Sequence, residues 1–525
     1  MEITYDALVV GAGIAGLTAA AYLAKGGFRV LVCERAKASG GLVADFKSDG
    51  FHFDAGLRAV ENSGVVRPML RELGLDLEFL TNPVSISIGD RAVRLDQGGL
   101  EAYGSMLKGI FPGERDSIDA ILAEIRRVMG IMDVLYGIDN PLFLDMKKDL
   151  HYLVKTLLPW LMRYQVNMRK MKKYQQPIDS HLTRLTSNQA LKDMISQHFF
   201  RNTPSFFALS YFGMYQDYMY PKGGTGALSR AMAEYVCAHG GEIACQTMID
   251  RFDWKKRIAE TPDGRSFRYR KLIWAADMKA LYAAAGVLPA SSVRAEAQAA
   301  LVGRGKGGDS VLSVYLALDI APDVIEDALG AHCFYTPEPS GLTTVGYENW
   351  RKAEGRQALE DWLRLFFERT TYEISCPAVR QADLAPEGKS GLIVSTLFSV
   401  DLVRQIEKAG WYPGFKALGI EWILKQLEKA VPGIGGRVLD ASCATPLTIE
   451  RTTGNTDGAI TGWAFDGAMP AEHRFQKIAS SVFTPIPNTF QAGQWTFSPS
   501  GLPVSILTGK LATDAAIKDL RREKP

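Results

Sequence analysis

LVVGAGIAGLTAAAYLAKGGFRVLVCER, residues 8–35, decides the fold of this chain. An apolar strand over Tyr5–Val10 leads into a glycine-rich turn, then an alanine- and leucine-rich helix over Leu17–Lys25, then a second apolar strand over Phe28–Cys33. Gly26 and Gly27 stop the helix. This strand–turn–helix–strand order predicts the opening unit of a Rossmann-type α/β domain, and the turn is typical of a dinucleotide-binding site.

The glycines of the turn have the spacing G-x-G-x-x-G. Gly11 permits the tight turn, Gly13 lets a pyrophosphate approach the backbone, and Gly16 lets the helix pack against the strand. The pyrophosphate would lie at the helix N-terminus, where free N–H groups favour negative charge. Glu34 follows the second strand and can bind ribose hydroxyl groups, which argues against NADP. The turn alone leaves FAD and NAD open.

The composition describes a large globular protein without a strong charge. The chain has 525 residues, 47% of them hydrophobic and 22% charged, with a formal net charge of +2. This length suffices for two or three domains, and the small net charge does not favour a nucleic-acid partner. Six scattered cysteines and seven histidines without ligand spacing predict a reducing compartment and no metal site. With the first strand so close to Met1, we expect no targeting segment and a cytoplasmic protein.

Later segments decide between the two cofactors. ASGGLVADFKSDGFHFDAG (residues 38–56) carries a second glycine pair, Gly40 and Gly41, and a strand over Gly50–Asp54. In flavoproteins of the glutathione-reductase type, such a pair wraps the ribityl and phosphate part of the cofactor, which an NAD dehydrogenase does not need. No histidine or cysteine has the pattern of a flavin attachment site, so we expect non-covalent FAD.

The order of the motifs along the chain resembles the phytoene desaturase, carotenoid isomerase and retinol saturase group of FAD enzymes. Its most specific parts are ATPLTIERTTGNTDGAITGW (444–463) and NTFQAGQWTFSPSGLPVSILTGK (488–510), where we expect a helix from about Pro503. The resemblance implies that Glu34 holds the adenosine ribose and that Gly493 contacts the phosphate. It also implies that Ile249, in the strand after a later Gly-Gly stop, meets adenine through its backbone. The FAD-binding residues expected are Gly11, Ala12, Gly13, Ile14, Ala15, Gly16, Glu34, Arg35, Gly40, Gly41, Leu42, Asp54, Gly56, Leu57, Ile249, Ala276, Gly493, Gly501, Leu502, Pro503 and Val504.

Two segments depart from the pattern of this group, and both lie on the predicted flavin face. The last loop, usually near P-G-G-G-x-P, reads SPSGLP, and FDAG is followed by LRAVEN, with Arg58 and Glu61. We expect Arg58 and Glu61 to be catalytic candidates, with Arg58 stabilising reduced flavin or orienting the substrate and Glu61 paired with it. The alternative is an ordinary ion pair on a loop.

The discontinuous motifs predict two domains. Residues 1–75, 220–295 and 440–525 would form a Rossmann-type, glutathione-reductase-like FAD-binding domain. Residues 76–219 and 296–439 would form an inserted mixed α+β substrate or cap domain. Substrate chemistry is then expected at the interface, at the carboxyl ends of the parallel strands.

A basic amphipathic segment lies inside the predicted cap domain. Residues 147–173 contain eight Lys or Arg and one Asp, interleaved with leucines and with Trp160, and Pro159 should kink or break the helix. Such a segment suits an anionic membrane surface. We expect membrane-associating helices at about 146–173 that bury Leu153, Leu157, Trp160 and Leu161 in the interface; a solvated face of a cap helix is the alternative.

Aromatic side chains crowd the segment 199–220. Because aromatic rings form large, rigid apolar walls, we expect Phe207, Tyr211, Tyr215 and Tyr218 to line a substrate tunnel. Ordinary core at the domain junction is the alternative for each residue.

The combined hypothesis is an FAD-dependent oxidoreductase that acts on C–C or C=C bonds of a long apolar isoprenoid or carotenoid-like substrate. It would bind peripherally to a membrane and use an electron partner that the sequence does not identify. Desaturation, saturation and cis–trans isomerisation all stay open. One alternative is a flavin oxidase or dehydrogenase that acts on an amine or a tetrapyrrole, which a polar, acid-lined pocket would favour. The other is a non-catalytic flavin-binding membrane protein.

Overall fold

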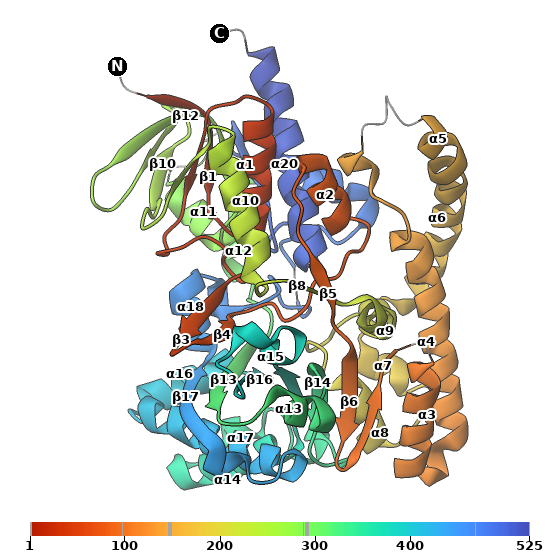
Figure 1. The fold of residues 1–525 in the computed structure, drawn as a ribbon. Coiled ribbons are helices and arrows are strands. Elements are labelled where there is room, and N and C mark those ends of the chain that lie inside the picture. The colour runs from red at the N-terminus through yellow and green to blue at the C-terminus, as the bar shows by residue number, and fades with distance from the viewer. Residues whose placement is uncertain are drawn as a thin grey trace.

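The computed structural model describes residues 3–96, 98–144, 150–286, 288, 293–467 and 469–523. Figure 1 shows two sheets at opposite ends of the molecule, with both chain termini beside the first sheet and a group of long helices along one side. A strand, a helix and a second strand follow one another around the glycine-rich turn, at residues 4–10, 14–25 and 30–33. The first βαβ unit is therefore present as the sequence predicts.

The first sheet has β1 (Thr4–Val10) at its centre, paired in parallel with β2 (Val30–Cys33) and β12 (Ser266–Trp274). Four shorter strands complete it: β9 (Glu242–Ala244), β10 (Arg251–Asp253), β11 (Ile258–Glu260) and β18 (Thr489–Gln491). β9 and β18 are also parallel to their neighbours. The carboxyl ends of these parallel strands therefore meet at one edge, which is where ligands bind in open α/β sheets.

Three helices pack on this sheet: α1 (Ile14–Lys25), α10 (Gly226–Ala238) and α20 (Leu502–Arg522). Small residues allow the close packing. A Cβ atom on Gly16 would lie 1.9 Å from the carbonyl oxygen of Gly11, and one on Gly509 would lie 2.5 Å from that of Ala15, so α20 crosses α1 almost backbone to backbone. The other helices at this end are α2 (Val66–Leu73), α11 (Met278–Ala284), α12 (Val293–Arg304) and α19 (Ile478–Ser481).

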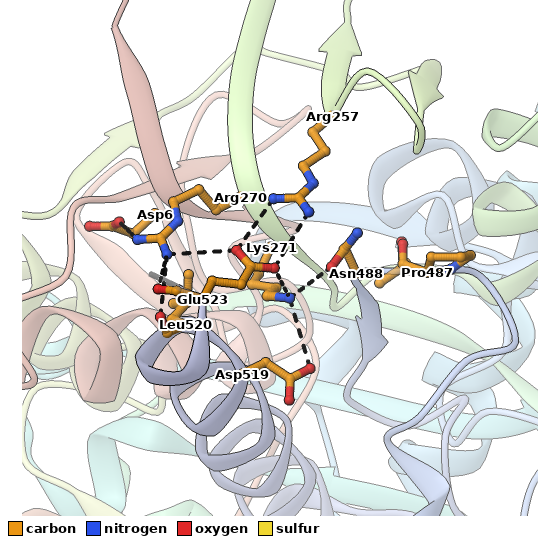
Figure 2. A network of polar contacts seen from close by, with 10 residues as sticks. Asp6, Arg257, Arg270, Lys271, Pro487, Asn488, Asp519, Leu520 and Glu523 are labelled. Atoms are coloured by element: carbon orange, nitrogen blue, oxygen red, sulfur yellow. Dashed lines mark hydrogen bonds and ion pairs between the residues drawn. The ribbon is translucent and has the colours of Figure 1, made fainter. Parts of the chain in front are cut away.

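An ion-pair network ties the end of α20 to the first sheet (Figure 2). Lys271 of β12 has a side chain only 4% exposed, and its Nζ lies 2.8 Å from Glu523 Oε1 and 2.7 Å from Asn488 Oδ1. Arg257 and Arg270 also contact the Glu523 carboxylate, at 3.3 and 3.6 Å. The Glu523 carboxylate is thus shared by three cations. These contacts hold the C-terminal end of α20 against the first sheet.

The second sheet is mainly antiparallel. Its strand order is β17 (Val438–Ala444), β13 (Ser310–Leu318), β16 (Ser390–Phe398), β15 (Tyr372–Ser375), β14 (His332–Thr336), β6 (Val84–Ile88) and β7 (Arg91–Arg94), and only β14 and β6 run parallel. The boundary predicted near residue 440 runs through β17, which pairs with β13 of this sheet. The division into domains stays a prediction.

Helices surround the second sheet, and two short strand pairs lie outside both large sheets. β3 (Asp45–Ser48) and β4 (Phe51–Asp54) form a hairpin, whereas β5 (Phe79–Thr81) and β8 (Met219–Pro221) pair antiparallel although they are distant in the sequence. The helices nearby in sequence are α13 (Pro322–Ala328), α14 (Gly355–Arg369), α15 (Pro377–Arg380), α16 (Val400–Lys408), α17 (Tyr412–Ala430) and α18 (Pro446–Thr453). A large apolar core fills the space between α14, α16, α17 and the strands.

The long helices at the side are α4 (Arg115–Tyr136) and α6 (Leu158–Met171), which lie alongside each other (Figure 1). With them are α3 (Gly99–Ile110), α5 (Leu150–Tyr152), α7 (Ile178–Leu182), α8 (Gln189–Ser196) and α9 (Ser205–Met214). Pro159, expected to kink or break the helix, lies in the first turn of α6, and helical structure runs on both sides of it. A π-helical turn, Leu153–Leu157, precedes it, and the wider turn accommodates a proline that has no N–H to donate. None of the described helices is long and apolar enough to span a bilayer.

Candidate functional site

One cavity of about 1020 Å³ joins the two sheets. It begins at the carboxyl edge of the first sheet, beside the glycine-rich turn, and ends between the strands of the second sheet and α9. This volume is at the upper end of the range for ligand pockets. Residues from the predicted cofactor site and from the predicted substrate tunnel line the same space.

The glycine-rich turn leaves an open cradle at the start of α1. Gly11 has φ +97°, and a Cβ atom there would lie 2.8 Å from the carbonyl oxygen of Ala275. A Cβ atom on Gly13 would meet no protein atom within 4 Å, because this residue faces the cavity. Gly40 forms a β-bridge with Gly13, and Gly41 adopts φ +59°. The two glycine pairs therefore form one backbone surface at a helix N-terminus, which fits a pyrophosphate.

Glu34 is held rigidly at the carboxyl end of β2. Its side chain is buried, and its two oxygens accept hydrogen bonds from the backbone N–H groups of Ala12 (2.7 Å) and Ala36 (2.8 Å). Each carboxylate oxygen has a further lone pair that is free to accept a ribose hydroxyl. The arrangement fits the ribose of an adenine dinucleotide, and the negative charge of Glu34 disfavours a 2′-phosphate beside it.

The start of α20 forms the other end of the cofactor site. Gly493 follows β18 with φ +94°, and its N–H donates to Thr508 Oγ1 of α20 (2.9 Å). Gly501 and Leu502 line the cavity at the first turn of this helix. Its free N–H groups and dipole therefore favour negative charge at this point. Ser500, one of the departures noted in the sequence, donates to the carbonyl oxygen of Thr461 (2.6 Å).

Most residues expected to bind FAD lie together in the cavity wall: Gly11, Gly13, Ile14, Ala15, Glu34, Arg35, Gly40, Gly41, Leu42, Gly56, Leu57, Ile249, Ala276, Gly493, Gly501 and Leu502. Ile249 lies in the loop before β10 and not in a strand. Ala12, Gly16, Asp54, Pro503 and Val504 are not part of the lining. Asp54 is fully buried behind it and accepts hydrogen bonds from Tyr220 and from the N–H and hydroxyl of Thr225.

Arg58 and Glu61 both line the cavity but do not pair with each other. Arg58 is 5% exposed, and it donates to the backbone oxygen of Asp54 and to Ser395 Oγ (3.2 Å). The described part of the chain has no ion pair between Arg58 and Glu61, so the expected pairing is wrong: the buried turn directs the arginine toward the second sheet. Burial raises the pKa of Glu61 to about 7. Its Oε1 would lie 3.6 Å from a Cβ atom on Gly501, which puts this carboxyl group at the α20 end of the cofactor site.

The four aromatic residues of the predicted tunnel line the cavity as a continuous wall. The rings of Phe207 and Tyr211, Tyr211 and Tyr215, and Tyr215 and Tyr218 follow one another at centroid distances of 5.2, 5.7 and 5.4 Å. Burial lowers the pKa of His198, which also lines the cavity, to about 4, and its Nε2 has no partner in the described residues. The sequence analysis did not single out His198.

A polar surface also lines the cavity. It consists of Ser313 of β13, Ser395 of β16 and Glu373 of β15, all on the second sheet. None of the three is predicted from the sequence, because serines in buried strands carry no distinguishing motif. The only signal was the acidic residue inside the short apolar strand YEIS.

The basic segment of the cap has an exposed apolar stripe that differs from the expected one. Lys147 and Lys148 lie outside the described residues. Trp160 turns inward, donates to the backbone oxygen of Val134 in α4 and packs on Tyr164 at 4.7 Å, so it does not face solvent as expected. The stripe that does face solvent consists of Val154, Leu158, Leu161, Met162 and Val166, which are 58%, 49%, 41%, 70% and 52% exposed.

Comparison with known proteins gives consistent results. The model of the family described as flavin containing amine oxidoreductase matches residues 14–517. All-trans-retinol 13,14-reductase of Danio rerio is 25% identical over 93% of this chain and 82% of its own length. Prolycopene isomerase 1 of an Oncidium hybrid cultivar is 23% identical over 99% of this chain and 85% of its own length. Among solved structures, cyclohexylamine oxidase from Brevibacterium oxydans has a similar fold, with a TM-score of 0.60, 14% identity and coverage of 99% of this chain and all of that one.

Proposed function

Because the chain belongs to the flavin containing amine oxidoreductase family, we propose that this FAD-dependent oxidoreductase acts on C–C or C=C bonds of a long, mainly apolar isoprenoid or carotenoid-like substrate. The observation that carries the proposal is the single cavity that runs from the dinucleotide cradle at Gly13 to the aromatic wall at Tyr211–Tyr218. The names of the retinol reductase and the prolycopene isomerase support the same substrate class.

FAD would be held by the backbone at Gly13 and Gly41, by Glu34 at the ribose, and by the first turn of α20 at the flavin end. When bound, FAD takes or gives a hydride at its N5 atom. The chain's task is then to hold a carbon–carbon bond of the substrate against the flavin and to exclude water. The aromatic wall suits the first task because flat rings bind an extended polyene through dispersion contacts without requiring a polar handle.

Glu61 is the residue best suited to move the matching proton. A hydride that reaches or leaves one carbon of a C=C bond requires a proton to reach or leave the adjacent carbon. A carboxyl group with a pKa of about 7 can give that proton in saturation or take it in desaturation near neutral pH. Its position near Gly501 supports this role. Isomerisation would need no net proton transfer, and the direction of the reaction stays open.

A flavin oxidase acting on amines is the second candidate, and two of the carboxyl groups that line the cavity, Glu61 and Glu373, favour it. Against it stands the aromatic wall, which is longer than a small amine needs. The two candidates predict different products: an amine oxidase releases hydrogen peroxide with an amine, whereas the proposed enzyme changes a polyene.

The deciding experiment is product analysis by mass spectrometry after the holoenzyme has been incubated with isoprenoid-containing membrane extract, separately under oxidising and reducing conditions. A change of two hydrogens in one isoprenoid gives desaturation or saturation, and a changed retention time at constant mass gives isomerisation. Peroxide production with a panel of amines, and none of these changes, would replace the proposal by the amine alternative. A flavin that no donor reduces and no substrate reoxidises would indicate a non-catalytic flavin protein.

Peripheral membrane binding through α6 belongs to the same proposal. The exposed apolar stripe of Val154, Leu158, Leu161, Met162 and Val166 recurs with spacings of four, three, one and four residues, which places it on one helix face. Exposed basic residues continue this face and flank it: Lys155, Arg163, Arg169, Lys170, Lys172 and Lys173. An apolar stripe with basic neighbours is complementary to the surface of an anionic bilayer, from which an apolar substrate would have to come.

A further inference from the structure

The part of the cavity that the second sheet lines is polar for a hydrocarbon site. Ser313 Oγ and Ser395 Oγ lie 2.8 Å apart, and Thr371, Thr396 and Ser442 also line this side. Most of these hydroxyl groups already bond to protein atoms: Ser395 also accepts from Arg58, and Thr371 and Thr396 pair with the hydroxyl groups of neighbouring threonines. The group that a hydrocarbon would leave without a full set of partners is therefore the charged one.

Glu373 is the charged member of this surface. It lies on β15, an inner strand between β14 and β16, and yet its side chain is 35% exposed. Because neighbouring strands cover both edges, the exposure is to the cavity that Glu373 lines. Its Oε1 lies 3.0 Å from His332 Nε2, and no other hydrogen bond to the carboxylate is present among the described residues. Oε2 is therefore free to accept a bond from a ligand.

His332 holds this carboxylate in position. Asn82 Nδ2 lies 3.4 Å from His332 Nδ1, so the amide donates to Nδ1 and the neutral ring carries its hydrogen on Nε2, facing Glu373. Burial lowers the pKa of His332, which keeps the ring neutral. Burial alone would raise the pKa of Glu373, but the hydrogen bond with His332 and the positive charges of Arg58 and Arg380 hold it below its usual value. Glu373 is thus an anion at neutral pH.

Two cations already act on this anion, because Arg58 and Arg380 both lower the pKa of Glu373. The Asp54 carboxylate is occupied by Tyr220 and Thr225. An ammonium group would add a third cation to this buried cluster. A neutral hydroxyl group adds none and still donates a hydrogen bond to Oε2.

We propose that Glu373 is a specificity-determining residue that accepts a hydrogen bond from a hydroxyl group of the substrate, so that the enzyme takes an isoprenoid alcohol in preference to the hydrocarbon of the same length. This inference rests on the proposed function. Tyr218 connects the two surfaces, because its ring stacks on His332 with centroids 5.9 Å apart. The alcohol group lies beside Glu373, and the apolar chain extends along Tyr215 and Tyr211.

Equilibrium binding to the FAD-loaded protein tests the proposal. The probes are an all-trans C20 isoprenoid alcohol, the C20 hydrocarbon without the hydroxyl group, and the corresponding primary amine, each followed by the change in flavin absorbance. We expect the wild type to bind the alcohol about 10- to 100-fold more tightly than the hydrocarbon, which is what a hydrogen bond to a charged acceptor contributes. The amine should bind more weakly than the alcohol.

Two substitutions at Glu373 separate the acceptor from its charge. Glu373→Leu should bring the preference for the alcohol to within about threefold while leaving hydrocarbon binding unchanged or tighter. Glu373→Gln keeps an acceptor and should retain part of the preference. Glu387→Gln, which changes an exposed carboxylate that does not line the cavity, is the matched control. Flavin content and thermal midpoint show whether each variant is folded.

Several outcomes would overturn the inference. Equal binding of alcohol and hydrocarbon by the wild type, or an unchanged preference in Glu373→Leu, would show that Glu373 does not select a hydroxyl group. Tighter binding of the amine, lost in Glu373→Gln, would show that the acid recognises a cation instead. If the hydrocarbon is bound and converted without any advantage for the alcohol, this inference fails and the proposed function stands. If no C20 probe binds, both fail.

Discussion

Reversing the charge of Lys170, Lys172 and Lys173 should release the protein from anionic membranes. All three residues are exposed at the end of α6. Each basic side chain near an anionic surface contributes about 1 kcal/mol, so the triple change to Glu removes about 3 kcal/mol of attraction and adds repulsion. We therefore expect binding to weaken at least ~100-fold.

The apolar stripe supplies the second contribution. Burying one such side chain fully contributes about 1.5–3 kcal/mol, and the five residues Val154, Leu158, Leu161, Met162 and Val166 are 41% to 70% exposed. Because each side chain is about half exposed, membrane binding would bury about half of it. The five residues together then contribute ~4–7 kcal/mol to the free energy of binding. Leu158→Ser with Met162→Ser should then weaken binding on its own, by about 2 kcal/mol, and should do so for neutral vesicles as well.

Co-sedimentation with vesicles measures both contributions. The wild type should sediment with vesicles that contain anionic lipid, less with neutral ones, and less again as salt shortens the screening length below about 8 Å. A matched control reverses Lys37, Lys352 and Lys408, which are exposed elsewhere on the molecule; Lys408 is in α16, on the side opposite α6 in Figure 1. Equal sedimentation of the wild type and the α6 variant, each with full flavin content, would refute the reasoning and leave α6 a solvated helix.

Four further outcomes are expected. Acid precipitation should release all flavin as free FAD, since its binding is non-covalent; flavin that stays with the precipitate contradicts this. Gly13→Val should abolish FAD retention because its side chain projects into the cradle, whereas Gly414→Val, whose Cβ atom also meets no protein atom, should keep it; stoichiometric flavin in the first variant would disprove the placement. Glu61→Gln should remove an ionisation near pH 7 from the kcat/KM profile, and the wild-type rate should fall above that pH if Glu61 gives the proton or rise if it takes one; an unchanged profile excludes the role. Lys271→Met should lower the free energy of unfolding in urea by about 1–3 kcal/mol, because it deprives Glu523 of its nearest cation (2.8 Å); a stability equal to that of the wild type would mean that the two arginines suffice.

The cofactor half of the molecule could be predicted from the sequence because its signals are local. The turn at Gly11–Gly16, the glycine pair at Gly40 and the acid at Glu34 each act through backbone geometry within a few residues. Even there the strand limits shift: the second strand begins at Val30 and not at Phe28.

The substrate half of the cavity could not be predicted as fully from the sequence, because its surface forms only when distant strands pair. Ser313, Glu373 and Ser395 come together through the antiparallel order of β13, β16 and β15, which no short motif encodes. Trp160 shows the same limit on a helix. An amphipathic pattern indicates that one face is apolar, but only the packing of α4 decides that Trp160 is half-buried and Met162 exposed.

The crossing of α1 by α20 constrains the order in which the protein can mature during synthesis. β1 and α1 leave the ribosome before α20, but the face of α1 that carries Ala15 and Thr18 is covered by Gly509, and β12 gains β18 as a neighbour only when residues 489–491 appear. Until then, the first βαβ unit exposes apolar surface and a half-built cradle. Cofactor loading must therefore wait until β18 and α20 have been synthesised, and the earlier segments need protection from aggregation in the interval. A nascent chain stalled before residue 489 should consequently be a chaperone client that holds no flavin.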